Sequence, residues 1–303
     1  MNSKKSGGEI LYKAFIYVAL ITFAITIIIP VGWAFLASVK ENAEFYGNPW
    51  ALPKGFYFQN FIDAFQKANM GRYFLNSILV TAIGLAILLI VALPAAYVLA
   101  RYRFKGRKWI QIAFMGGLFI NVNYIVVPIF LMLVEGNTLI GRPVFTNNLF
   151  MVALIYASTA LPFTIYLLSG YFSTLPKDFE EAAYVDGATN FRVLRMIILP
   201  VSKPVLATVT LFVIVNHWNS WFDGLIYLNS PMKYPLQTYL QTQVVSTNLM
   251  ALETLRDVRQ IGLISDRTGK AAQIFLAAVP VLMIYPFLQK YFTTGIVMGS
   301  VKG

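Results

Sequence analysis

Two short segments of this chain group polar side chains of types that could do chemistry. In residues 175–203, the carboxylates Asp178, Glu180 and Glu181 fall at the start of an expected helix, where the helix dipole favours negative charge. In residues 216–223, asparagine amides lie among tryptophan rings, a combination that can hold a polar ligand by hydrogen bonds and stacking. The side chains of the first segment can therefore form ion pairs, and those of the second can bind a ligand.

Several kinds of catalytic site are excluded by residue type. The 303 residues include no cysteine, which excludes disulfides, thiolate metal sites and cysteine nucleophiles. The one histidine, His217, cannot form a histidine metal cluster by itself. No Gly-x-Ser-x-Gly nucleophile elbow occurs, and the apolar stretches contain no convincing acid–base pair. We therefore expect no metal site, no cofactor bound by this chain and no enzyme activity.

Long apolar stretches make up most of the rest of the chain. Of all residues 58% are hydrophobic and only 12% are charged, which is too few charges to cover a soluble surface of this size. Six stretches without Asp, Glu, Lys or Arg are long enough to cross the hydrocarbon core as helices, which takes roughly 20 residues each. The sequence therefore predicts an all-α membrane protein with six transmembrane helices in a single domain, residues 1–303. The expected spans are about 14–39, 73–100, 109–134, 146–172, 204–226 and 271–291.

Lysine and arginine residues predict which ends of the spans face the cytoplasm. Basic residues cluster before the first span, after the second, after the fourth and after the last, so that with six spans they all fall on one side. The positive-inside rule makes that side cytoplasmic, with both termini inside. The formal net charge of +11 is therefore attributed to membrane topology and not to nucleic-acid binding. The residues concerned are Lys4, Lys5, Lys13, Arg101, Arg103, Lys105, Arg107, Lys108, Lys177, Arg192, Arg195, Lys203, Lys290 and Lys302.

The fourth connection, residues 175–203, is typical of a helix, a sharp turn and a second helix. Pro176 suits a helix start, because its missing N–H would be unpaired there in any case. Gly187 follows Asp186 and can adopt a positive φ to end the first helix. The second helix is expected to begin at about Thr189 and to stop before Pro200, because the residue before a proline disfavours the α region.

This loop resembles the EAA loop of ABC importer permeases. The family pattern is E-A-A, two residues, D-G-A, eight residues, I-x-L-P and a proline four residues later. The matching residues are Glu181, Ala182, Ala183, Asp186, Gly187, Ala188, Ile197, Leu199, Pro200 and Pro204. The resemblance implies a type I ABC importer permease fold, in which the first helix of the loop is a coupling helix docked in a cleft of an ATPase. It also implies that Glu181 pairs with a basic ATPase residue and that Gly187 permits the turn that presents the helix.

The resemblance further implies an assembly of several subunits. Two separate ATPase subunits would carry ATP and Mg²⁺, because this chain has no phosphate-binding loop of the Gly-x₄-Gly-Lys-Ser/Thr type. A second, homologous permease subunit would complete a heterodimer, and an extracytoplasmic solute-binding protein would deliver the substrate. The complex would lie in the bacterial cell membrane, in contact with lipid and not with nucleic acid.

Two further features resemble the carbohydrate permeases of the maltose type. The first is the Trp-Asn pair in residues 216–223, which together with Tyr-Pro-Leu-Gln-Thr at 234–238 is similar to a subgroup associated with complex oligosaccharides. The second is the C-terminal tail, whose residues Val301, Lys302 and Gly303 would contact the ATPase pair. The resemblance therefore implies a carbohydrate as substrate.

The polar residues at the end of the fifth span are candidates for the substrate pathway. Polar side chains in membrane spans usually face a bundle interior or a cavity and not lipid. The candidates are Asn216, Trp218, Asn219 and Asp223, with Asn121 and Asn123 of the third span as alternatives. Tryptophans at the end of a span also form belts at the level of the lipid headgroups, and that interpretation of Trp218 and Trp221 stays open here.

Two other transport functions are compatible with part of the sequence. An ABC importer permease for another small solute, such as an amino acid or a peptide, would carry the same loop. A secondary transporter that works alone would need a coupling-ion site, and the spans contain no internal carboxylate apart from Asp223 at an end. An ATPase that co-purifies with the chain would reject the second of these alternatives.

Overall fold

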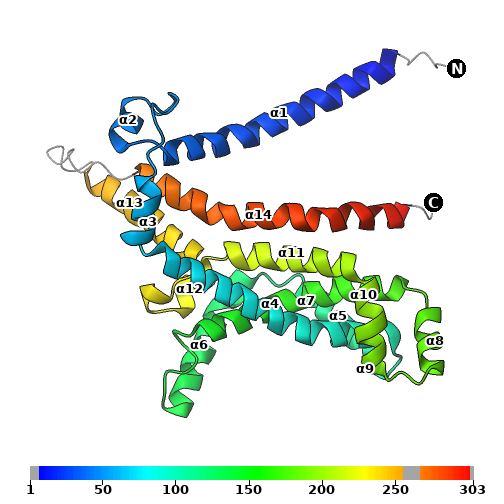
Figure 1. Ribbon diagram of the computed structural model, residues 1–303. Helices are drawn as coiled ribbons and strands as arrows, with labels where there is room; N and C mark the ends of the chain where they lie inside the picture. The colour runs from blue at the N-terminus through cyan, green and yellow to red at the C-terminus, as the bar shows by residue number, and fades with distance from the viewer. Residues whose placement is uncertain (1–6, 255–266, 301–303) are drawn as a thin grey trace. The chain divides into compact units, whose positions relative to one another are not determined.

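The computed structural model describes residues 7–254 and 267–300, and every regular element in these ranges is a helix (Figure 1). The prediction of an all-α protein is therefore confirmed for the described residues. The elements are α1 (Gly7–Ser38), α2 (Asn42–Gly47), α3 (Gln59–Gln66), α4 (Met70–Arg101), α5 (Arg107–Gly117), α6 (Val122–Ile140), α7 (Leu149–Thr174), α8 (Asp178–Val185), α9 (Asn190–Val193), the π-helical stretch η1 (Leu194–Ile198), α10 (Leu199–Val201), α11 (Lys203–Asn219), α12 (Phe222–Tyr227), the 3₁₀ turn η2 (Pro231–Lys233), α13 (Leu236–Thr254) and α14 (Arg267–Ser300).

Five of the described helices are long and apolar enough to cross a membrane. They are Leu11–Ser38, Met70–Arg101, Val122–Ile140, Leu149–Thr174 and Arg267–Ile284. A sixth crossing is present if Asn190–Val201 and Lys203–Asn219, whose axes differ by 81°, count as one bent span. The described chain is therefore a multi-pass membrane protein with five spans, or six with the bent pair. The side of the membrane that each connection faces stays a prediction.

The third expected span, 109–134, is not one helix. Two helices, α5 and α6, replace it, with a non-helical break between them. α5 ends at Gly117, where a Cβ atom would lie 3.0 Å from Pro162 Cγ of α7, so glycine eases this close approach of the two helices. After the break, the side chain of Asn121 accepts a hydrogen bond from Asn123 N at 3.0 Å and caps the start of α6. Because the broken stretch is mostly apolar and carries no charged residue, hydropathy alone does not reveal the break.

The other expected spans differ less from the helices. The fifth ends earlier than expected: α11 stops at Asn219, and Ser220, with an extended backbone (ψ 121°), separates it from α12. The helices α1, α4, α7 and α14 correspond to the spans expected at 14–39, 73–100, 146–172 and 271–291.

Residues 7–70, together with residues 250–254 and 267–278, form one compact unit. Its fully buried Lys40 donates hydrogen bonds to Asn48 O at 3.3 Å, to Pro49 O at 3.2 Å and to Ala51 O. Asn60 of α3 donates to Lys40 O at 2.8 Å and ties the backbone of Lys40 itself to α3. The ammonium group therefore holds the loop after α2 from inside, since its three donors are all used by carbonyls.

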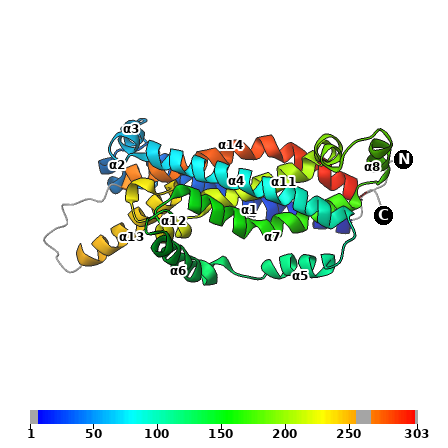
Figure 2. The same cartoon turned by 90° about the horizontal axis from the view of Figure 1, so that it is seen from below.

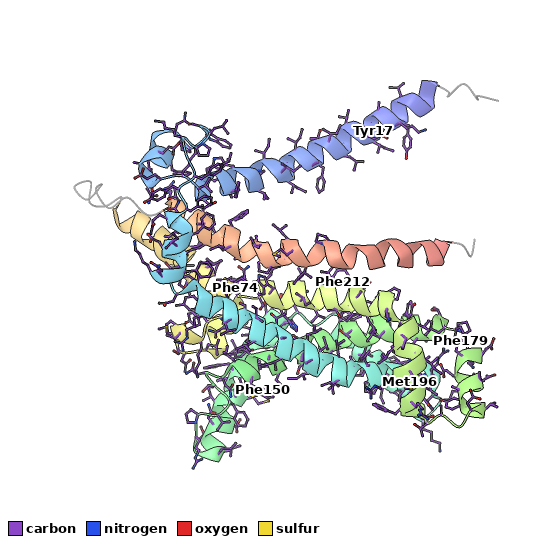
Figure 3. All side chains as sticks on the ribbon, in the orientation of Figure 1. Tyr17, Phe74, Phe150, Phe179, Met196 and Phe212 are labelled. Carbon is purple, nitrogen blue, oxygen red and sulfur yellow. The ribbon has the colours of Figure 1, made fainter. Side chains whose placement is uncertain are left out.

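α1 presents its apolar side chains outward. None of the most apolar stretch of this helix is buried within the chain, and Tyr17 stands free on its surface (Figure 3). A helix of this length with exposed apolar side chains suits a bilayer as its solvent.

The second compact unit contains residues 71–249 and α14 from Val279 onward. Leu88 of α4, Leu168 of α7 and Val209 of α11 share one apolar core, so these three long helices are packed together. Both views place α8 at one end of these helices and α12 at the other (Figures 1 and 2). The unit therefore separates the two candidate segments by roughly 25 Å, the length of the 17-residue helix α11.

Candidate functional site

α8, the first helix of the loop at 175–203, ends at Gly187. The φ of Gly187 is +76°, in the left-handed region. Its N–H donates to Tyr184 O at 3.0 Å, and Ala188 N donates to Ala183 O at 2.9 Å, so the last carbonyls of α8 are paired. No atom outside its chain neighbours lies within 4 Å of a Cβ atom built on Gly187. Glycine is therefore favoured here by backbone conformation and not by lack of space.

The helix after Gly187 does not stop before Pro200, contrary to expectation. α9 continues through η1 and α10 to Val201. Leu199 N donates to Leu194 O, five residues back, whereas an α-helix would use the fourth. Pro200 then lies in the first turn of α10, where a missing N–H is tolerated. The sharp change of direction comes after Val201, between this helix and α11.

The outer face of α8 is uncovered. Glu181 and Ala182 are exposed, Val185 exposes 88% of its surface, and Phe179, marked in Figure 3, exposes 49%. Apolar side chains exposed together on one short helix indicate a surface that another protein covers. This face contains the glutamate and one of the alanines of the E-A-A pattern. The other predicted loop residues are divided: Asp186 and Pro200 are exposed, Ala188 and Leu199 are half-buried, and Ala183 is buried.

The inner face of α8 carries Glu180, which the sequence analysis named only as one of three carboxylates at the helix start. Glu180 is buried, and its Oε1 lies 2.6 Å from Nε of Arg101, the last residue of α4. Tyr97 of α4 donates from its hydroxyl to Glu180 Oε2 at 3.2 Å. The two adjacent glutamates therefore face opposite ways, Glu181 outward and Glu180 into the chain. The available signal was Arg101, the first of five basic residues after an apolar span, which we assigned only to membrane topology.

A cavity of about 310 Å³ lies at the opposite end of the unit, around the end of α11. Its size is at the lower limit of ordinary ligand pockets, about 300–1,000 Å³. Its lining supplies amides, hydroxyls, aromatic rings and one carboxylate, and contains no lysine or arginine. The lining residues are Val122, Asn123, Tyr156, Thr159, Asn216, His217, Asn219, Ser220, Trp221, Phe222 and Asp223.

A chain of polar contacts holds the wall of this cavity. The buried imidazole of His217 lies 4.8 Å from the Tyr156 ring, and its Nε2 is 3.2 Å from Tyr156 O. The Tyr156 hydroxyl donates to Ser220 O at 3.4 Å, and Ser220 Oγ donates to Asp223 Oδ2 at 2.8 Å. Asp223 lies in α12, after the spanning helix, and burial raises the pKa of its carboxyl, although the hydrogen bond from Ser220 opposes the shift. The histidine ring and the hydrogen-bonded α11–α12 turn therefore shape the wall.

The structure brings together four of the six predicted pathway residues. The four in the cavity wall are Asn123, Asn216, Asn219 and Asp223. Trp218 is not in the wall: it is buried, with its ring edge-to-face against Phe74 of α4 at 5.4 Å (Phe74 is marked in Figure 3). Asn121 caps α6. Both of these residues therefore have packing or capping contacts in place of a position in the wall.

Other cavity residues were not predicted from the sequence. Tyr156 and Thr159 lie three residues apart on α7, and this spacing puts them on one face of the helix. That spacing was a usable signal, but α7 has polar side chains at several positions. The predicted tail contacts, Val301, Lys302 and Gly303, lie outside the described residues.

Comparison with known proteins gives consistent matches over almost the whole chain. Residues 92–298 match the family described as binding-protein-dependent transport system inner membrane component. The diacetylchitobiose uptake system permease protein NgcG of Streptomyces coelicolor is 31% identical over 291 residues, covering 96% of this chain and 89% of that protein. The polygalacturonan/rhamnogalacturonan transport system permease protein YtcP of Bacillus subtilis is 30% identical over 304 residues, covering 97% of this chain and 99% of that protein.

The fold is also similar to a solved structure. A chain in the crystal structure of a bacterial ABC transporter involved in the import of the acidic polysaccharide alginate superposes with a TM-score of 0.81 at 27% identity. The match covers 96% of this chain and 100% of that chain.

Proposed function

The chain belongs to the family of binding-protein-dependent transport system inner membrane components, and from this premise we propose that it is one permease subunit of an ATP-driven carbohydrate importer. One observation carries the proposal. The same helical unit has an uncovered helix with exposed apolar side chains at one end and an amide-lined cavity at the other. An importer subunit needs both, because a partner must move it and a solute must pass it.

The uncovered face of α8 is the proposed contact with a separate ATPase. Glu181 offers an exposed carboxylate that can pair with a basic side chain, and Phe179 and Val185 offer apolar surface beside it. Two ATPase subunits carry ATP and Mg²⁺ in this proposal, and this chain binds neither. The C-terminal tail at 301–303 is the second proposed contact with the ATPase pair.

The cavity chemistry supports an uncharged, hydroxyl-rich solute at this chain's half of the pathway. Asn216 and Asn219 are exposed amides that can exchange hydrogen bonds with sugar hydroxyls, each contributing about 0.5–1.5 kcal/mol net. The Trp221 and Phe222 rings can pack against a sugar face. No lysine or arginine lines the cavity, so an acidic sugar would find no cationic partner in this wall. Weak, replaceable contacts suit a transit site.

Two further partners complete the proposed assembly. A second, homologous permease subunit closes the pathway as a heterodimer, since this chain supplies only one wall. An extracytoplasmic solute-binding protein delivers the sugar from outside. The assembly sits in the bacterial cell membrane, with α1 presenting its apolar side chains to lipid.

Isolation of the native complex tests this proposal. The tagged chain is purified in mild detergent from its own membrane, the co-purifying subunits are identified, and the attached solute-binding protein is titrated by calorimetry. The titration uses neutral oligosaccharides, uronate oligosaccharides and amino acids. We expect an ATPase, a second permease, and a binding protein that takes a neutral oligosaccharide. A complex without an ATPase, or a binding protein that takes amino acids, would contradict the proposal.

A further inference from the structure

α8 is attached to the end of α4 by side chains as well as through the backbone. Besides its ion pair with Glu180, Arg101 donates from Nη2 to Leu175 O at 2.8 Å, and so also holds the segment that leads into α8. The Tyr102 and Tyr184 hydroxyls lie 3.3 Å apart, which adds a contact one turn further along α8. With the Tyr97–Glu180 hydrogen bond, four polar contacts therefore join the end of α4 and the adjacent Tyr102 to α8 and the segment that leads into it.

The α4–α8 ion pair is buried. The side chains of Arg101 and Glu180 expose only 7% and 9% of their surface. Breaking such a pair leaves a charge without its partner in a poorly solvated place, which is strongly unfavourable. Tyr97 reinforces the arrangement, because its hydroxyl bonds Glu180 and its ring packs edge-to-face on Phe172 of α7 at 6.5 Å. Partial separation of α8 from α4 would therefore be costly.

The far end of α4 is bonded to the segment that follows α12. Asn76 Nδ2 donates to Met232 O and to Tyr234 O, each at 3.1 Å. Leu236 N donates to Ser77 Oγ at 2.7 Å. The 26 residues from Asn76 to Arg101 form one continuous helix, which spans roughly 39 Å. α4 therefore has side-chain contacts at both ends of the unit.

α4 also contacts the cavity wall. A Cβ atom on Gly84 would lie 3.3 Å from Nδ1 of His217, so α4 packs directly against a lining residue. The segment bonded to Asn76 leads into α13, where Thr238 Oγ1 donates to Trp221 O at 2.9 Å. Displacement of α4 along its axis would thus reach both the wall and the rim of the cavity.

We propose that α8 and α4 move as one body during transport, and that the Arg101–Glu180 ion pair transmits movement of the ATPase through α4 to the cavity. The inference rests on the proposed function. It adds a route through α4 to the direct backbone route through α9, α10 and α11. Arg101, Glu180 and Tyr97 are positioning residues in this scheme, because none of them touches the solute.

Crosslinking tests the one-body movement directly. The chain has no cysteine, so Tyr102→Cys with Tyr184→Cys gives a labelling pair without background when the partner subunits are made cysteine-free. The assembled complex is treated with a short or a long bifunctional maleimide, and ATP-driven sugar uptake is measured in proteoliposomes. Each single-cysteine variant, treated with the same reagents, is the control for modification itself.

We expect uptake within about twofold of the unlinked double variant with both linkers. If the two helices must separate, the short linker will stop uptake while ATP hydrolysis continues and the long linker will permit it, and that result would overturn the inference. Failure of the proposed function has a different signature, since the untreated parent complex would then show no ATP-driven uptake at all.

The adjacent glutamates give a matched pair of variants. Glu181→Gln removes the outward carboxylate and is expected to weaken ATPase capture. Glu180→Gln removes the inward one and is expected to leave ATPase capture and ATP hydrolysis intact, while sugar imported per ATP falls roughly 2- to 30-fold, the range of typical coupling changes.

The Tyr102–Tyr184 crosslink should restore import per ATP in Glu180→Gln, which a merely structural role for Glu180 would not produce. Parent-like import per ATP in Glu180→Gln, or no rescue by the crosslink, would contradict transmission through the ion pair.

Discussion

Replacement of Gly187 should weaken ATPase docking, and the size of the effect should be set by the backbone conformation of this residue. The φ of Gly187 is +76°, and a Cβ atom there would meet no other atom within 4 Å. A new side chain would therefore meet no clash, and its cost is only that of placing a residue with a Cβ in the left-handed conformation, about 1–2 kcal/mol. Since about 1.4 kcal/mol is a factor of ten, Gly187→Val should lower the population of the native turn by up to roughly 30-fold. The apparent Kd for the ATPase should rise by the same factor.

The assay is capture of the purified ATPase by the permease pair in nanodiscs, titrated to give an apparent Kd. Gly187→Asn should bind more tightly than Gly187→Val, because asparagine tolerates the left-handed region better than other residues with a Cβ. Gly141→Val is the matched control: its φ is +70°, its Cβ position is also open, and it ends α6 in place of α8. Parent-like binding by Gly187→Val, or an equal loss in Gly141→Val, would refute the reasoning.

Four further outcomes are expected. Asn216→Leu and Asn219→Leu should each change the KM for sugar uptake by about 2- to 13-fold, the equivalent of one hydrogen bond, with ATPase capture unchanged; unaltered uptake of several oligosaccharides would remove these amides from the pathway. Gly224→Ala should lower the thermal unfolding temperature in detergent, because its Cβ would collide with the Thr238 hydroxyl and lie 3.1 Å from Pro235 Cδ; an unchanged temperature would contradict this packing. Lys40→Met should destabilise the fold by about 1.5–3 kcal/mol for each charged hydrogen bond lost, read from the same unfolding curve, and a parent-like curve would show that the three carbonyls do not need the ammonium group. Deletion of residues 299–303 should lower sugar imported per ATP, and crosslinks from Lys302 only to exterior proteins would reject both the tail contact and the predicted topology.

Local sequence patterns predicted the elements that depend on local physics. Long apolar stretches correspond to α1, α4 and α7, because burial in lipid needs only length and hydropathy. The turn at Gly187 was predicted for the same kind of reason, since a glycine after an aspartate favours a left-handed helix end. These predictions needed no information about which other part of the chain lies nearby.

Features that depend on tertiary partners were missed. Nothing local separates Glu180 from Glu181; only the position of Arg101, about 80 residues earlier, decides which carboxylate is buried. The break before α6 and the helix that continues through Pro200 depend on a close approach to Pro162 and on a π-helical turn. Trp218 was placed in the pathway by its type, whereas its contact with Phe74 buries it in the packing between α4 and α11.

The proposed function is tested most directly by sugar uptake into proteoliposomes that contain this chain with its companion permease, its ATPase and its binding protein. The uptake of a neutral oligosaccharide is followed with ATP on the ATPase side of the membrane and, as a control, with ATP only on the opposite side. A further sample has an imposed ion gradient in place of ATP. The proposed function predicts uptake that requires ATP, requires the binding protein, and is lost when Glu181→Ala replaces the parent chain. Uptake driven by the ion gradient without ATP, or unchanged by Glu181→Ala, would contradict it.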